Sequence, residues 1–221
     1  MSKLLWKPWN KVVELRDELR APDLAMNLFA ADLYDVVMGK ARPVYGDPRE
    51  FFALTYPTFN LRQLARDVVA RLANENDKAV RQLELTYGGG KTHTLITLYH
   101  LVHDPDRLPR LPAVDEFLHH IGRTPPRSRV AVLAFDKLDA ETGMDVRGPA
   151  GEVRRLKNPW SVLAFQLAGV EGLRRLHAEG LDAERDSAPA EPLLVELLAA
   201  PARDGLSTLV LIDETLMYAR Q

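Results

Sequence analysis

The sequence contains no cysteine, which excludes disulfide bonds, thiolate zinc sites and cysteine nucleophiles. It also lacks any apolar run approaching the ~18 residues that a membrane-spanning helix needs. Charged side chains interrupt the opening stretch, MSKLLWKPWNKVVELRDELR, so no signal peptide is expected there. The G-x-S-x-G and H-E-x-x-H motifs of serine hydrolases and zinc proteases are missing. These absences predict a cytoplasmic protein without a membrane segment.

No charge of one sign dominates the sequence either. The formal net charge is −2, so no overall basic field indicates nucleic acid as a partner, and direct contact with DNA is left open. The chain has 221 residues, of which 46% are apolar and 27% charged. This is an ordinary globular composition, and the chain is long enough to bury one sizeable core.

Apolar residues at helical spacing dominate the first third of the chain. Helix starts are expected at Asp23, at Asp47 followed by Pro48, and at Asn60. A polar break over Asn74–Lys78 separates these helices from a more apolar segment. We therefore expect a helical N-terminal segment, residues 1–76, followed by an α/β core, residues 77–221.

The core is organised around residues 81–103. Leu83–Tyr87 alternates apolar and polar side chains, which is the period of a β-strand. A glycine turn and the first residues of an apolar helix follow: Gly88, Gly89, Gly90, Lys91, Thr92 and His93. Strand, glycine turn, Lys-Thr and helix are together typical of a phosphate-binding loop. The usual motif has its first glycine where this chain has Leu85, so a glycine-rich turn before an ordinary helix is the alternative.

Each part of this loop has a chemical role in the predicted site. Glycines lack Cβ, so the backbone N–H groups approach an anion closely, and a helix that begins there directs its positive dipole end to the same point. Lys91 is expected to reach the β- and γ-phosphates of a nucleotide, and the hydroxyl of Thr92 to ligate Mg²⁺. Two interpretations of His93 stay open: contact with phosphate or a partner loop, or packing inside the protein.

Two further apolar runs have the length of strands. Val130–Phe135 has the pattern of a parallel strand covered on both faces. Leu209–Ile212 ends in Asp213 and Glu214, at the strand end where open α/β sheets bind ligands. Asp213 is expected to hold Mg²⁺, and Glu214 to orient and deprotonate an attacking water; an acid that only caps the next helix is the alternative. Residues 136–157 are expected to form a polar surface excursion.

Five segments carry a likeness to a known family: WKPW from Trp6, DPREFFALTYPTFNLRQL from Asp47, LELTYGGGKTHTLITLYHL from Leu83, NPWSVLAFQLAG from Asn158 and LVLIDETLMYAR from Leu209. GGGKTH followed by LYH is more specific than a general phosphate-loop motif. With these segments the chain resembles the N-terminal part of the large P-loop ATPases of domain-of-unknown-function family 499. These are AAA-like proteins found beside DNA methyltransferases and helicases in phage-defence islands. Thr215 departs from the apolar pair that usually follows I-D-E in the family.

The resemblance implies a P-loop NTPase fold, which is a three-layer α/β/α arrangement around a parallel sheet. It implies ATP binding and hydrolysis with Mg²⁺, with Lys91 and Glu214 as catalytic residues and Thr92 and Asp213 at the metal. It also implies a role in DNA modification or phage defence, with DNA methyltransferases or helicases as partners.

The resemblance further implies a strand order of residues 130–135, 209–212 and 83–87. The sequence ends soon after Glu214, before the sensor strand and helical lid of such ATPases, so a fragment with an incomplete sheet is expected. The open strand edge at residues 83–87 then predicts self-association into a homo-oligomer. A nucleotide-binding interaction module without turnover is the alternative function. A small-molecule kinase is disfavoured by the acidic pair after the last strand.

Overall fold

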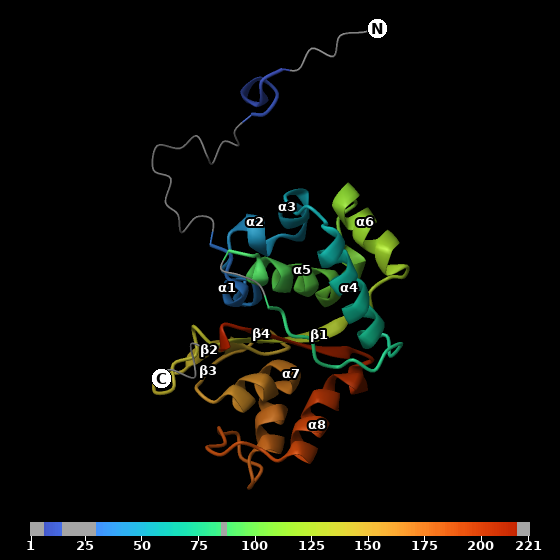
Figure 1. Ribbon diagram of the computed structural model, residues 1–221. Helices are drawn as coiled ribbons and strands as arrows, with labels where there is room; N and C mark the ends of the chain where they lie inside the picture. Colours follow the sequence, from blue (N-terminus) through green and yellow to red (C-terminus); the bar gives the residue numbers. More distant parts are fainter. Residues whose placement is uncertain (1–6, 15–29, 85–87, 216–221) are drawn as a thin grey trace. The chain divides into compact units, whose positions relative to one another are not determined.

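The computed structural model describes most of the chain: residues 7–14, 30–84 and 88–215. The chain forms two compact units, residues 1–31 and residues 32–221. In the first unit the described residues contain a short 3-10 helix, η1 (Trp9–Lys11). All other elements belong to the second unit (Figure 1). Within the described ranges, no helix is both long and apolar enough to cross a membrane.

Helices follow one another in the first part of the second unit: α1 (Leu33–Met38), α2 (Pro43–Gly46), α3 (Pro48–Ala53) and α4 (Phe59–Leu72). The helix start predicted at Asp47 is confirmed. Its carboxylate accepts the N–H groups of Arg49 and Glu50 at 2.8 and 3.0 Å. Pro48 takes the first helical position, where the missing N–H leaves no hydrogen bond unmade.

The other helix starts differ from the prediction. α4 begins after Thr58, whose hydroxyl accepts a backbone N–H of the first turn at 3.3 Å, so Asn60 lies inside that turn. Thr58 is the cap because its backbone is still extended, with ψ of 156°. α1 begins after Asp32, whose carboxylate accepts a backbone N–H at 3.2 Å. Asp23, the predicted cap of this helix, lies outside the described residues.

The central strands are β1 (Ser128–Ala134) and β4 (Ser207–Asp213), which pair in parallel with Ala134 opposite Asp213. This confirms that the two predicted apolar runs are neighbouring strands. The apolar residues of β1 are all buried, as expected for a strand covered on both faces. β4 is less buried than predicted, since Ile212 is 47% exposed.

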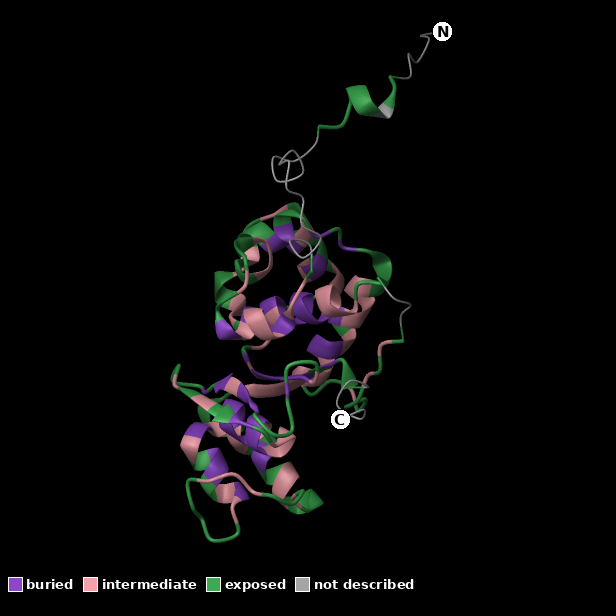
Figure 2. Cartoon of the chain, turned by 90° about the vertical axis from the view of Figure 1, so that its left-hand side faces the viewer, coloured by how far each residue is buried: buried purple, intermediate pink, exposed green. Residues whose placement is uncertain are grey.

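Helices lie on both sides of this strand pair (Figure 1). On one side α5 (Lys91–His103) contacts both strands, α4 contacts β4, and α6 (Pro112–Ile121) packs on α4. On the other side α7 (Pro159–Leu176) contacts β1, and α8 (Glu191–Ala199) packs on α7. Figure 2 shows buried residues in both groups of helices. Short 3-10 helices precede α6 and β4: η4 (Pro105–Arg107) and η5 (Ala200–Asp204). The fold is thus a mixed one, with a small parallel sheet between helices.

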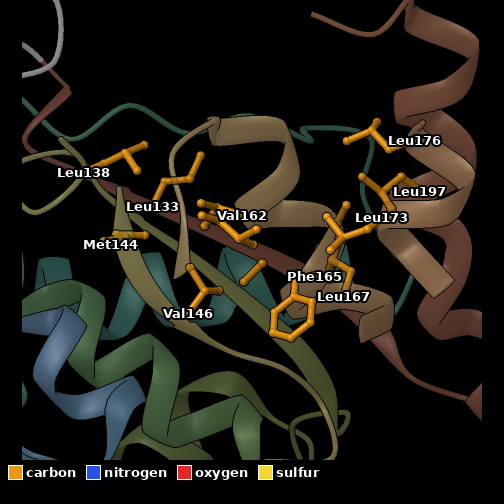
Figure 3. Packing of buried hydrophobic residues seen from close by; sticks show 13 residues of the cluster. Leu133, Leu138, Met144, Val146, Val162, Phe165, Leu167, Leu173, Leu176 and Leu197 are labelled. Carbon is orange, nitrogen blue, oxygen red and sulfur yellow. The ribbon is translucent and has the colours of Figure 1, made fainter. Parts of the chain in front are cut away.

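Residues 136–157 contradict the prediction of a polar surface excursion. They contain an antiparallel hairpin of β2 (Met144–Arg147) and β3 (Val153–Leu156). Its inward side chains join a buried cluster with residues of β1 and α7 (Figure 3): Met144, Val146, Leu156, Leu133 and Phe165. In β2, the charged residues Asp145 and Arg147 alternate with the apolar Met144 and Val146, so the average composition of the segment is polar. Alternation of this kind is typical of a strand with one buried face.

The predicted strand Leu83–Tyr87 is not seen in the part of the chain that the structure describes. Residues 81–84 form no strand, and residues 85–87 lie outside the described ranges. Odd-numbered side chains of residues 81–84 are half-buried and even-numbered ones exposed, so the predicted period of two is present. A strand also needs a hydrogen-bonded neighbour, which that period does not encode. The predicted strand order is confirmed only for β1 beside β4, and self-association stays a prediction.

At the edge of β1 that faces away from β4, a side chain of α7 forms hydrogen bonds with the backbone of Val132. Gln166 of α7 accepts the N–H of Val132 at 2.9 Å and donates to the carbonyl oxygen of Val132 at 2.7 Å. Gln166 is itself buried, with 5% of its surface exposed. Its amide therefore satisfies two backbone groups that water cannot reach.

Replacing Gln166 by leucine keeps the side-chain volume similar and removes both hydrogen bonds. We expect Gln166→Leu to lower the free energy of unfolding by about 2 to 6 kcal/mol, because each of the two buried backbone groups left unpaired costs about 1 to 3 kcal/mol. Urea unfolding measures the change, and Arg174→Leu at an exposed position of α7 is the matched control. Equal stability of the two variants would contradict this role of Gln166.

Candidate functional site

The candidate site consists of the glycine turn, the first turn of α5 and the end of β4. Gly90 is the N-cap of α5 and has φ of 80° and ψ of 26°. Gly88 also has a positive φ, 77°. Both values lie in the left-handed region that favours glycine. A Cβ on either residue would meet no atom within 4 Å, so the backbone conformation, rather than lack of space, requires glycine. Gly88, Gly89 and Gly90 are all exposed.

The start of α5 has no side-chain cap. The N–H groups of its first turn therefore keep their capacity to bind an anion, and the positive end of the helix dipole lies beside them. Lys91, the first residue of the helix, is half-buried and forms no ion pair with any carboxylate of the described residues. The exposed glycines, the uncapped helix and this cation together suit an anionic ligand.

Thr92 and Asp213 are 121 residues apart in the sequence and form a direct hydrogen bond. The Thr92 hydroxyl donates to Oδ2 of Asp213 at 2.9 Å. Asp213 is the last residue of β4 and only 8% exposed, and its Oδ1 accepts the N–H of Glu214 at 3.1 Å. The structure therefore brings together the two residues that the sequence predicts as metal ligands.

Glu214, the predicted catalytic base, has a left-handed backbone with φ of 53°. This conformation is uncommon for a residue with a Cβ and costs about 1 to 3 kcal/mol. Strain of this kind is concentrated at functional sites. The residue is exposed, and within the described part of the chain no hydrogen bond fixes its carboxylate.

His93 packs against α3 and the residues that follow it. Its ring lies on Phe51, with 4.6 Å between ring centroids, and its Nε2 is 3.1 Å from the Thr55 hydroxyl. Thr55 donates its single hydroxyl hydrogen to the carbonyl oxygen of Phe51 at 2.8 Å, so Nε2–H of His93 is the donor to Thr55. Burial lowers the pKa of His93 below its ordinary value, so the ring is neutral near pH 7. These contacts agree with the packing interpretation.

Phe51 and Thr55 support the site and are not predicted by any sequence motif. Thr55 lies 38 residues before His93, and no local pattern connects the two. Only the packing of α3 against α5 brings these side chains together. The first turn of α5 is thus fixed by residues far from the glycine motif.

No preformed metal centre of three or more His, Asp or Glu side chains occurs among the described residues. Mg²⁺ in nucleotide sites takes one or two protein ligands and completes its shell with phosphate oxygens and water. Thr92 and Asp213 offer a ligand set of that size. The donor types at the site therefore fit Mg²⁺ bound together with a nucleotide.

The family model of the DUF499 N-terminal domain matches residues 9–221 of the chain. No curated protein and no solved structure matches the chain. The matched range includes the glycine turn, the first turn of α5 and the end of β4.

Three histidines of α5 predict acid sensitivity: the half-buried His93, the buried His100 and the exposed His103. Desolvation lowers the pKa of each. The histidines of the unfolded chain titrate near about pH 6.5, above the folded values, so the unfolded chain binds more protons than the folded protein as the pH falls through this region. We expect the free energy of unfolding to decrease between about pH 7.5 and pH 5.5 in urea unfolding. His93→Gln should reduce this decrease, whereas His119→Gln at an exposed position should keep it. A free energy of unfolding that does not change with pH would contradict the lowered pKa values of these histidines.

Proposed function

Because the chain belongs to the family of the DUF499 N-terminal domain, we propose that it is an ATP-binding P-loop module that serves as an ATPase in a DNA-modification or phage-defence system. The proposed fold is the three-layer α/β/α arrangement of P-loop NTPases. The proposed cofactors are ATP and Mg²⁺. DNA methyltransferases or helicases, and further copies of this chain, are the proposed partners.

The hydrogen bond between Thr92 and Asp213 is the observation that carries this proposal. In P-loop ATPases the Thr after the loop lysine and the acid at the end of a neighbouring strand act on one Mg²⁺ ion. A glycine-rich turn alone, or an acid that caps a helix, requires no contact between these two residues. Their contact at 2.9 Å therefore favours a joint site over two independent local motifs.

The site has the donors that such a ligand requires. Lys91 and the N–H groups of the glycine turn would bind the β- and γ-phosphates, since the glycines are exposed and Lys91 follows them directly in the chain. Thr92 and Asp213 would give up their mutual hydrogen bond and place their oxygens on the metal. Mg²⁺, when bound, neutralises negative charge on the phosphates.

A nucleotide-binding module without turnover is the second candidate, and the state of Glu214 favours it. A general base must lie within hydrogen-bond reach of the water that it activates. In the described residues the carboxylate of Glu214 is exposed and not fixed by a hydrogen bond, while the residues proposed for binding already converge. Binding and turnover therefore need separate tests.

Removing the ammonium group tests nucleotide binding. We expect Lys91→Ala to weaken Mg-ATP binding at least about tenfold in calorimetry, because one hydrogen bond to a charged group contributes about 1.5 to 3 kcal/mol. Thr92→Val should make the affinity for ATP depend less on Mg²⁺, because it removes one of the two proposed metal ligands. Lys78→Ala, at an exposed position before the glycine turn, is the control. Equal affinity of Lys91→Ala and Lys78→Ala would refute the site.

Phosphate release in a single turnover separates the two functions. With enzyme in excess over ATP, the ATPase proposal expects release well above the uncatalysed background by the wild-type chain. Glu214→Gln should bind Mg-ATP as wild type and lose most of this release, while Glu179→Gln, also exposed, should keep it. Background-level release from a wild-type chain that binds ATP would instead establish the module without turnover.

A further inference from the structure

A cavity lies at the opposite end of α5 from the glycine turn. It has a volume of about 540 Å³ and is lined by residues at the amino ends of β1 and β4, by the last turn of α5 and by the tip of the β2–β3 hairpin. Neither the glycine turn nor Asp213 contributes to it. Its volume lies within the about 300 to 1,000 Å³ typical of sites for small molecules.

Arginines dominate the charge of this cavity: Arg127, Arg129 and Arg147. Arg127 forms an ion pair with Asp104, which also lines the cavity. Asp204 is the other acidic residue of the lining, so three guanidinium groups and two carboxylates leave a net charge of +1. Burial lowers the pKa of His103 in the same lining, so at neutral pH its ring adds no charge.

Two of the arginines have unused hydrogen-bonding capacity. Nε of Arg129 is buried and has no hydrogen-bond partner among the described residues, which costs about 1 to 3 kcal/mol. The nearest oxygen of Asp204 is 4.0 Å from Nη2 of Arg129, and that carboxylate side chain is 70% exposed, so the pair is weak. Arg147 donates to the carbonyl oxygen of Met38 at 2.5 Å and pairs with no carboxylate of the described residues.

The wall of the cavity also offers an uncharged aromatic surface. The rings of Tyr99 and His103 are stacked, with 4.8 Å between centroids and 14° between planes. Guanidinium groups with free donors match phosphate oxygens in a forked geometry. A phosphate monoester carries about −1.5 to −2 charges near pH 7, which suits several arginines better than a single carboxylate does.

We propose that this cavity binds a small phosphate-bearing molecule of about mononucleotide size, held by Arg129 and Arg147. Phosphate oxygens would accept hydrogen bonds from the Nη groups of Arg129 and displace the exposed carboxylate of Asp204. The site is distinct from the proposed ATP site and does not depend on it. Because α5 extends from one to the other, each site contacts one end of the same helix.

Calorimetry on the Lys91→Ala chain, without Mg²⁺, tests the proposal with 5′-AMP and inorganic phosphate as probes. The Lys91 substitution removes the cation of the proposed ATP site, so the two sites are not confused. We expect 5′-AMP to bind, and Arg129→Gln or Arg147→Gln to weaken it at least about tenfold. Arg110→Gln, at an exposed position outside the cavity, is the control.

The thermal melting temperature of each variant shows whether it is folded, and Arg147→Gln carries the test if Arg129→Gln fails to fold. Binding of inorganic phosphate with the same losses would show that the phosphate group alone is recognised. No binding of either probe, or equal binding by the arginine variants and Arg110→Gln, would overturn the proposal. A single-stranded oligonucleotide serves as a further probe. If it binds more tightly than 5′-AMP and loses affinity on the same arginine substitutions, the proposal of a small-molecule site is overturned.

Discussion

Strand β1 lies in the middle of the second unit with helices on both sides, so each of its backbone N–H and C=O groups needs a partner inside the protein. β4 supplies partners along one edge through a parallel ladder. On the other edge, the amide of Gln166 pairs with both backbone groups of Val132. The positions of β4 and α7 both follow from this requirement. The hairpin β2–β3 then adds its apolar face to the same core.

The candidate site is a consequence of this arrangement. Parallel pairing places Asp213 beside Ala134, at the carboxyl end of both strands. α5 crosses the same two strands, so its first turn reaches that end and Thr92 meets Asp213. The packing of His93 on Phe51 and its hydrogen bond with Thr55 hold this turn from the other side. α3 and α5 belong to the same compact unit, and Phe51 of α3 contributes to the position of the first turn of α5.

Several of these elements were predictable from local sequence. Asp47 followed by Pro48 predicted the start of α3, because a cap and its N–H partners lie within three residues. The apolar runs predicted β1 and β4 as strands, and the family resemblance implied that they are neighbours. The glycines with Lys91 predicted the turn and the start of α5. The hairpin within residues 136–157 was missed because buried and charged residues alternate along β2, so the average composition of the segment is polar.

The sequence by itself determined the helix starts that depend on neighbouring residues, the two central strands and the types of side chain at the candidate site. Tertiary structure alone decided which distant residues meet: Thr92 with Asp213, His93 with Thr55, and Gln166 with Val132. It also decided that residues 81–84 form no strand and that arginines of separate segments line one cavity. The physical reason is how far apart in the sequence the interacting residues lie. A cap or a strand period depends on a few adjacent residues, whereas the partner of a buried polar group is set by the packing of the whole core.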